Sequence, residues 1–288
     1  MSAPLVHEDR CLLLYTDLDR TLLPNGPQPE SPGARRLFAR LVDRPQVTLA
    51  YVTGRHLALV DEAITHYRLP KPDFVISDVG TRIHARGHDG WRLWRDWEDE
   101  IESGWAGHDH THLSLLFRDL KSLRLQEPTK QNAHKLSYYL PVQSNRLALQ
   151  EEMQQRLDQK GIHASLVWSV DEPAGVGMLD VVPGWGTKLH AVEFLRQRLG
   201  IALEHTLFAG DSGNDLQVMA SPVPSVLVAN AADEVRESAL LQARVTGHGD
   251  ALYLAHGGYR GMNGNYSAGI LEGLAHFRPD FGDWMKLE

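Results

Sequence analysis

The first 85 residues alternate between short apolar runs and longer stretches whose apolar residues recur with the period of a helix. The apolar runs, at 11–16, 47–52 and 74–77, predict buried strands. The stretches between them, at 34–42 and 57–67, predict helices. Strands that alternate with helices of this length are typical of parallel βαβ units with right-handed crossovers.

The pattern changes near residue 86. Four of the seven tryptophans lie between residues 86 and 115, and the spacing of Trp91, Trp94 and Trp97 predicts that they share one face of a helix. A strand, a helix and two further strands are then predicted at 135–142, 145–160, 165–170 and 178–182. Residues 86–182 therefore indicate an inserted α+β unit.

The alternation of strand and helix resumes after Pro183. The predicted elements are a helix at 188–199, strands at 206–209 and 225–228, and a closing helix at 267–276. The expected fold class is α/β. A doubly wound, Rossmann-like parallel sheet would be formed by residues 1–85 and 183–288, with an α+β domain inserted at 86–182.

Composition and charge narrow the class of partner. A formal charge of −8 argues against nucleic acid or an anionic membrane surface, but not against a small anionic substrate in a local basic pocket. Cys11, in the first predicted strand, is the single cysteine, so no disulfide is expected, which suits a reducing cytosol. The first ten residues contain no apolar signal core, and no apolar run approaches the length of a membrane span. We therefore expect a cytoplasmic protein.

Two pairs of acids follow predicted strands. Asp17 and Asp19 come directly after the first strand, and side chains two residues apart share a face. Asp211 and Asp215 follow the strand at 206–209 in the same way. Because open α/β sheets bind their ligands at the carboxyl ends of the strands, these carboxylates can meet around a hard cation such as Mg²⁺.

The first acid pair suits phosphoryl transfer by covalent catalysis. The carboxylate of Asp17 would attack phosphorus to form an aspartyl-phosphate, and Asp19 would exchange protons with the leaving oxygen and the later water. A divalent cation would hold the carboxylates and the phosphate together. Most isolated Asp-x-Asp pairs, however, only begin a polar turn.

Phosphate-binding groups are expected at a strand end and a helix start. Thr53 and Gly54 end the second predicted strand, where a hydroxyl and a backbone N–H suit phosphate oxygens. Lys188 begins a predicted helix and would supply a point charge. Taken singly, Thr53 is better explained as a helix cap and Lys188 as a solvated surface lysine. The occurrence of these motifs together and in this order is improbable by chance.

Taken together, these motifs resemble those of the haloacid dehalogenase (HAD) superfamily of Mg²⁺-dependent phosphatases. The resemblance implies that Asp17 is the nucleophile, that Asp19 is the general acid/base, and that the phosphate-binding residues are Thr53, Gly54, Lys188 and Asn214. It also implies a metal site made by Asp17, the backbone carbonyl of Asp19, Asp211 and Asp215, with Asn214 in support. The insertion at 86–182 then corresponds to the large cap of one branch of the superfamily.

Further segments resemble sucrose-phosphate phosphatases, and they extend the similarity over most of the chain: 78–81, 135–138, 180–183 and 267–277. This resemblance implies sucrose 6F-phosphate as the substrate, a cap that closes over the sugar, and a sucrose-phosphate synthase as a candidate partner. Lys135 and Ser137 on the cap, and Asp180 near the hinge, are candidates for binding sugar hydroxyls. Roles at the cap surface and hinge would explain these three residues equally well.

Three departures bear on the identity of the sugar. Arg20 stands where the superfamily commonly has a small or amide residue, Arg82 stands where the sucrose-phosphate family has a glutamate, and residues 184–187 differ from the usual approach to the lysine. These differences leave open another glycosyl-sugar phosphate, such as mannosylfructose phosphate or glucosylglycerol phosphate.

A non-catalytic module that binds a sugar phosphate or docks a synthase is the alternative from another class. Such a module predicts the loss of at least one catalytic group. The chain retains all six: Asp17, Asp19, Thr53, Lys188, Asp211 and Asp215.

Overall fold

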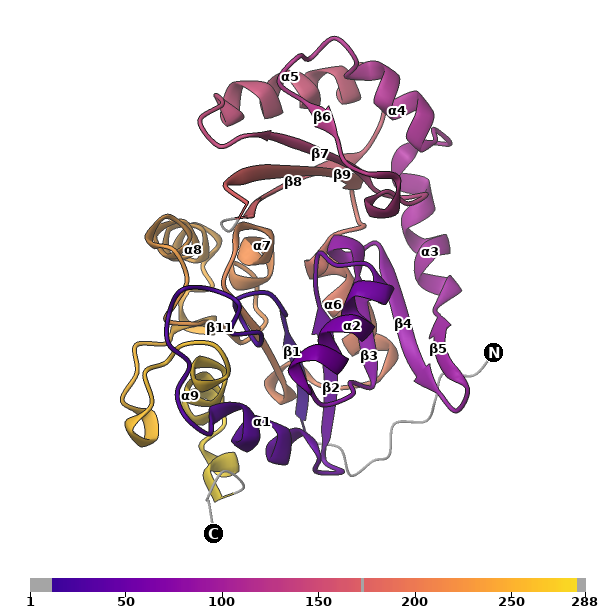
Figure 1. Cartoon of the computed structure of the whole chain (residues 1–288). Coiled ribbons are helices and arrows are strands. Elements are labelled where there is room, and N and C mark those ends of the chain that lie inside the picture. Colours follow the sequence, from indigo (N-terminus) through magenta and orange to yellow (C-terminus); the bar gives the residue numbers. More distant parts are fainter. Residues whose placement is uncertain (1–11, 172–173, 284–288) are drawn as a thin grey trace.

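The computed structural model describes residues 12–171 and 174–283, and its larger part is an eight-stranded sheet covered by helices on both faces (Figure 1). The strands lie in the order β12-β11-β10-β1-β2-β3-β4-β5. Their bounds are β1 (Leu12–Thr16), β2 (Val47–Val52), β3 (Phe74–Ser77), β4 (Arg82–Gly87), β5 (Gly90–Leu93), β10 (Thr206–Gly210), β11 (Ser225–Leu227) and β12 (Leu252–Leu254). The pairings from β12 to β3 are parallel, whereas β4 and β5 pair antiparallel at the edge. The predicted doubly wound α/β core is confirmed, with an antiparallel edge in addition.

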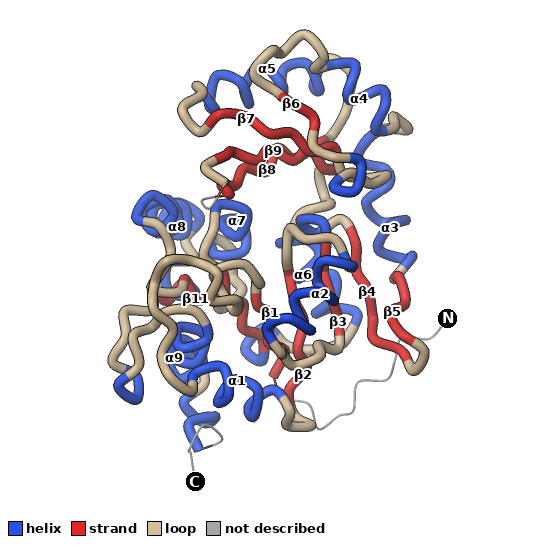
Figure 2. The backbone as a smooth tube through the Cα atoms, viewed as in Figure 1, coloured by secondary structure: helices blue, strands red, loops and turns tan. Residues whose placement is uncertain are grey.

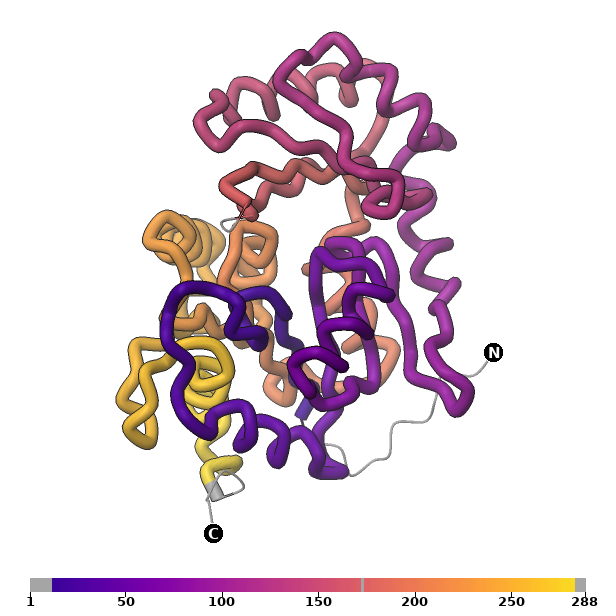
Figure 3. Tube along the Cα trace, in the orientation of Figure 1, coloured from indigo at the N-terminus to yellow at the C-terminus, as the bar shows by residue number. Residues whose placement is uncertain are grey.

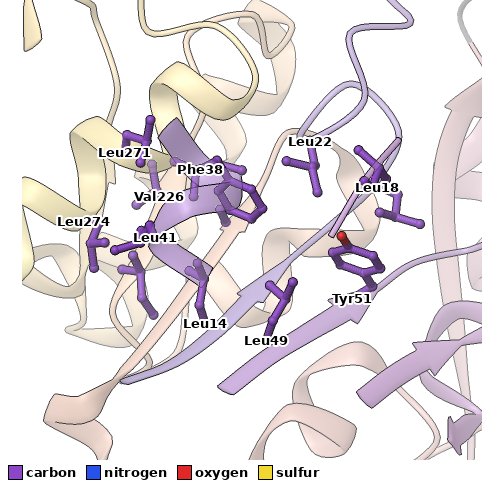
Figure 4. Packing of buried hydrophobic residues seen from close by; sticks show 14 of the residues in the cluster. Leu14, Leu18, Leu22, Phe38, Leu41, Leu49, Tyr51, Val226, Leu271 and Leu274 are labelled. Atoms are coloured by element: carbon purple, nitrogen blue, oxygen red, sulfur yellow. The ribbon is translucent and has the colours of Figure 1, made fainter. Parts of the chain in front are cut away.

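Side chains along β1 point alternately to the two faces of the sheet, and each face carries its own hydrophobic core. Leu12 and Leu14 belong to one core, and Leu13 and Tyr15 to the other. The first core is covered by α1 (Ala34–Val42), α2 (Leu57–Tyr67) and α9 (Ser267–Phe277), and Figure 4 shows Phe38 and Leu41 of α1 packed beside Leu271 and Leu274 of α9. The second is covered by α3 (Arg95–Glu102), α6 (Lys188–Arg198), α7 (Leu216–Met219) and α8 (Asp233–Thr246).

A separate antiparallel sheet forms the cap, in the strand order β6-β7-β9-β8. Its elements are β6 (Arg124–Leu125), α4 (His110–Leu116), β7 (Leu136–Pro141), α5 (Arg146–Asp158), β8 (Ala164–Asp171) and β9 (Val176–Pro183). Both helices cover the side of this sheet that faces away from the core (Figure 2). Leu136, Tyr138 and Leu179 pack on that helical side, so the alternate residues Ser137 and Asp180 lie on the side that faces the core.

The chain crosses into the cap after α3 and returns before α6 (Figure 3). The insertion was predicted to begin at residue 86, but β4 and β5 continue the core sheet to Leu93. The helix α3 also packs Trp97 and Ile101 into the second core. These antiparallel strands escaped prediction because β3, β4 and β5 follow one another as a meander, without the helices that marked the other strands.

The predicted tryptophan face is wrong. Trp91 lies in β5 and Trp94 immediately precedes α3, so only Trp97 is within the helix. The indole of Trp97 is buried and donates a 2.9 Å hydrogen bond to the backbone carbonyl of Gly80. Cys11, predicted in the first strand, lies outside the described residues. Within the described ranges, no helix combines the length and apolar character that crossing a membrane requires.

Candidate active site

Three acids gather where β1 and β10 end. The backbone N–H of Asp17 donates to the carbonyl of Ala209 at 2.8 Å, which ties the end of β1 to β10 just before Asp211. Asp17, Asp211 and Asp215 are all buried, and each offers a carboxylate oxygen within 4.8 Å of the other two. The sequence therefore correctly predicted that the two acid-tipped strands bring their carboxylates together.

A 3-10 turn, η5 (Gly213–Asp215), aims the third acid into this cluster. Ser212 caps the turn, and the Oδ2 atom of Asp215 accepts the backbone N–H groups of Asp211 and Ser212, each at 3.1 Å. Gly210 provides the space, because a Cβ at this position would lie 2.5 Å from the Cγ atom of Asp215. The Gly-Asp-Ser-Gly-Asn-Asp sequence is thus a folding unit that orients Asp215.

Lys188 supplies the one buried ammonium that contacts this acid cluster in the described structure. As the first residue of α6, it projects Nζ to 3.0 Å from Asp17 Oδ2 and 2.8 Å from Asp215 Oδ1. Gly80 allows the start of α6 to approach so closely. A Cβ on Gly80 would lie 2.4–2.6 Å from the backbone of Thr187 and Lys188, and its φ of +109° also favours glycine.

The cluster holds more negative than positive charge. Burial raises the pKa of Asp17 to about 7; Lys188 opposes this shift, and Asp215 and Asp19 add to it. Burial likewise raises the pKa of Asp211 well above its usual value, with further contributions from Asp17 and Asp215. One ammonium among three buried carboxylates leaves an excess of negative charge. Carboxylate oxygens that carry a net negative charge fit a hard divalent cation such as Mg²⁺.

Asp19 lies outside the three-acid cluster and is held by Arg55. The guanidinium donates through Nε to Oδ2 at 2.7 Å and through Nη2 to Oδ1 at 2.6 Å, and Asn25 adds a 2.7 Å hydrogen bond. Burial would raise the pKa of Asp19, but the hydrogen bonds and charge of Arg55 outweigh it, so the pKa is lowered. Sequence reasoning missed Arg55 as a functional residue. The signal was its place directly after Thr53 and Gly54.

The predicted phosphate-binding residues face the same edge. Thr53 is buried at the end of β2, and its hydroxyl accepts the backbone N–H of Arg55 at 3.2 Å. Gly54 lies near Asn214, whose Nδ2 atom would be 3.9 Å from a Cβ on the glycine. Gly54 and Asn214, predicted from distant parts of the chain, therefore lie together. They lie beside the acid cluster that Lys188 contacts.

The sequence profile of the sucrose-6F-phosphate phosphohydrolase family matches residues 10–278. The chain belongs to this family. Two curated relatives and one solved structure illustrate the similarity. A protein of Nitrosococcus oceani described as a putative HAD-like hydrolase is 52% identical over 96% of this chain and 74% of its own length. Sucrose-phosphatase 1 of Nicotiana tabacum is 29% identical over 92% of this chain.

The crystal structure of the sucrose-phosphatase from Synechocystis sp. PCC6803, in complex with sucrose and phosphate, has the same HAD-type fold. It superposes with a TM-score of 0.74 at 27% identity, covering 93% of this chain and 98% of that one. The present chain spans only 59% of the length of the tobacco relative.

In this member of the sucrose-6F-phosphate phosphohydrolase family, the predicted sugar-binding residues pair with other protein groups. The hydroxyl of Ser137 donates a short hydrogen bond to Asp180. The ammonium of Lys135 lies 3.6 Å from the carboxylate of Asp78, a core residue that sequence reasoning did not select. All four side chains are buried, and Ser137 and Asp180 lie on the face of the cap sheet that looks toward the core.

Arg20 and Arg82, the two arginines that depart from the family pattern, contact different parts of the protein. Arg20 has a left-handed backbone (φ 57°), donates through Nη2 to the carbonyl of Asn230 at 2.9 Å, and places Nε 3.9 Å from Asp211 Oδ2. Arg82 instead places Nε 3.9 Å from Glu98 of α3. Arg20 therefore adds positive charge beside the acid cluster, whereas Arg82 pairs with a helix of the core.

Proposed function

We propose that this protein is a Mg²⁺-dependent phosphatase that hydrolyses sucrose 6F-phosphate to sucrose and phosphate. The observation that carries the proposal is the buried contact of Asp17 with Lys188, beside Asp211 and Asp215. Membership of the family supports phosphate-ester hydrolysis, and the polar side of the cap sheet supports a hydroxyl-rich leaving group.

Asp17 is the nucleophile of this mechanism. Its carboxylate attacks phosphorus, a carboxylate-oxygen–phosphorus bond forms, and the bond between phosphorus and the sugar oxygen breaks. Lys188 attracts the phosphate oxygens electrostatically and stabilises the ionised carboxylate. Mg²⁺ bound by Asp17, Asp211 and Asp215 would neutralise the charge that accumulates between the carboxylates and phosphate.

Asp19 moves the protons. In its protonated form it donates to the departing sugar oxygen. The resulting carboxylate then takes a proton from the water that attacks the aspartyl-phosphate, which releases phosphate and regenerates Asp17. The two hydrogen bonds from Arg55 stabilise the carboxylate form that acts in this second step.

The decisive experiment compares kcat/KM in the presence of Mg²⁺ for a panel of phosphate esters: sucrose 6F-phosphate, mannosylfructose phosphate, glucosylglycerol phosphate, fructose 6-phosphate and glucose 6-phosphate. We expect a preference for sucrose 6F-phosphate of about two orders of magnitude, equivalent to about 3 kcal/mol of transition-state discrimination. A flat profile, or a preference for another ester, would contradict sucrose 6F-phosphate as the substrate. Either result would leave the aspartyl-phosphate mechanism in place.

The Asp17→Asn variant distinguishes a phosphatase from a non-catalytic binding module. It should fold and release no phosphate from any ester in the panel, because the nucleophile is gone. If the natural protein is folded and equally inactive, the non-catalytic sugar-phosphate module becomes the better explanation.

A further inference from the structure

A buried ion pair joins the cap to the core beside the candidate active site. Lys135, just before β7, places Nζ 3.6 Å from Oδ1 of Asp78, and the two side chains are only 5% and 3% exposed. A second contact lies next to it, because Nδ2 of Asn132 donates to Oγ1 of Thr81 at 3.1 Å. Both cap residues therefore contact one core turn, residues 78–81.

That turn is backbone-strained and touches both phosphate-binding elements. Asp78 and Val79 have φ values of 54° and 63°, a left-handed conformation that is unfavourable for a β-branched residue. The backbone N–H of Val79 donates to the carbonyl of Thr53 at 3.1 Å. Gly80 packs against the backbone of Thr187 and Lys188. A shift of this turn would therefore disturb Thr53 and Lys188 together.

The ion pair is poorly compensated by other groups. The side chain of Lys135 donates no hydrogen bond to any of the residues in 12–171 and 174–283, and Asp78 accepts one from the Ser77 hydroxyl at 3.0 Å. A buried charge without its counterion is costly, whereas the same charge in water is not. Removing one partner should therefore destabilise the closed arrangement of cap and core more than an open one.

We propose that Asp78 is a positioning residue that, through Lys135, holds the cap closed over Asp17 and couples closure to the placement of Thr53 and Lys188. The pair forms only when cap and core meet. Its kinetic consequence rests on the phosphatase function proposed above. The structural consequence, a shift between closed and open populations, does not depend on the substrate.

The structural test measures the distance between cap and core by pulsed electron paramagnetic resonance. Spin labels are placed at Leu147 of α5 and Val245 of α8, which are 70% and 77% exposed, in a Cys11→Ser background. We expect one short-distance population for the unaltered pair and a second, longer one for Asp78→Asn. Asp78→Glu, which keeps the carboxylate, should restore the short distance. If Asp78→Asn does not fold, Lys135→Met is measured in its place.

Asp119→Asn is the matched control. Asp119 pairs with Arg156 at 2.6 Å within the cap, so its neutralisation changes an ion pair without touching the cap–core boundary. A distance distribution that stays unchanged in the Asp78 or Lys135 variant, or that shifts equally in the control, would overturn the proposal.

The kinetic test uses substrates of two sizes. Asp78→Asn should lower kcat/KM for sucrose 6F-phosphate on the order of 100-fold, mainly through KM, because closure must now leave Lys135 unpaired. Hydrolysis of p-nitrophenyl phosphate, which the cap need not cover, should fall less than hydrolysis of sucrose 6F-phosphate, because the small ester responds to displacement of Thr53 and Lys188 and not to the loss of closure. The loss of kcat/KM in the Asp78→Asn/Lys135→Met double variant should be smaller than the product of the fold-losses in the two single variants. Equal losses on both substrates would contradict positioning through the cap.

The two proposals fail in distinguishable ways. If the unaltered protein does not hydrolyse sucrose 6F-phosphate, the proposed substrate is wrong and the distance measurement still tests the role of Asp78. If the substrate is correct and the distances do not shift, the role of Asp78 is wrong.

Discussion

Gly210 and Asp215 occupy a space that would not hold one more carbon atom: a Cβ on the glycine would lie 2.5 Å from the Asp215 carboxyl carbon. The same carboxylate accepts the Lys188 ammonium at 2.8 Å. Gly210 therefore leaves the room that Asp215 needs, and Asp215 in turn holds the lysine beside the nucleophile.

Gly210→Ala should consequently impair catalysis and stability together. The added methyl must displace Asp215, which we expect to cost about 1–3 kcal/mol of unfolding free energy, as for other overpacked sites. Thermal unfolding and kcat/KM measure the two effects. Gly249→Ala is the control, since no heavy atom lies within 4 Å of a Cβ there. Wild-type turnover in Gly210→Ala would contradict this account of Asp215.

Asp211→Asn should raise stability in the absence of Mg²⁺ and weaken the stabilisation that Mg²⁺ provides. Burial disfavours the ionised carboxylate, as the raised pKa of Asp211 indicates, so the amide should unfold at a higher temperature than the natural protein in chelator. Mg²⁺ at 100 times its Kd should stabilise the natural protein by about 2.7 kcal/mol, and the variant by much less. Unfolding scans with and without Mg²⁺ measure both quantities. An equal Mg²⁺ effect on the two proteins would remove Asp211 from the metal site.

Arg55→Met should raise the pKa of Asp19. The natural pKa is depressed because hydrogen bonds and charge from Arg55 outweigh the effect of burial, and the variant retains only the burial, the Asn25 hydrogen bond and the weaker effect of the Lys188 charge. A pH titration of the Asp19 carboxyl carbon by NMR measures the change. We also expect kcat to fall about 10-fold, because the carboxylate loses the planar fork that orients it.

Arg55→Lys and Arg36→Met complete this series. The lysine variant keeps the positive charge but lacks the planar guanidinium with its two donors. It should therefore restore the low pKa of Asp19 more fully than it restores kcat. Arg36 is exposed on α1 and serves as a control for the loss of an arginine. An unchanged Asp19 titration in Arg55→Met would show that other groups depress its pKa.

His84 should make the fold sensitive to mild acid. Burial, with a further contribution from the charge of Arg82, lowers the pKa of His84 to about 4 against the weaker opposition of Asp78 and Asp61. Between its ordinary pKa, about 6.5, and the folded value, the unfolded chain binds more protons, so stability falls as the pH falls. The total loss should be about 3 kcal/mol by pH 4.

The uncharged variant His84→Gln isolates this contribution. Urea unfolding at pH 7, 6, 5 and 4 should show a shallower decline for the variant than for the natural protein. Parallel declines would assign the acid sensitivity to other groups.

Local sequence determined the elements in which the apolar pattern and its boundaries agree. The bounds of β2 and α2 match the prediction at both ends, since a continuous apolar run and a helical period are each bordered by turn residues. The acid cluster was predictable as well. Parallel strands place their carboxyl ends at one edge, so Asp17 and Asp211 had to meet once both strands were recognised.

Only the tertiary structure decided the contacts between residues far apart in sequence. Trp91, Trp94 and Trp97 have helical spacing, yet pairing with β4 draws Trp91 into a strand. Nothing near Lys135 indicates Asp78, because an ion pair across two domains depends on how the cap sits on the core. The spacing of Asp17 and Asp19 predicted that both emerge on one face, but Arg55 holds Asp19 apart from the buried acids. Periodicity and strand ends are properties of neighbouring residues, whereas desolvation and pairing depend on which distant groups the fold brings into contact.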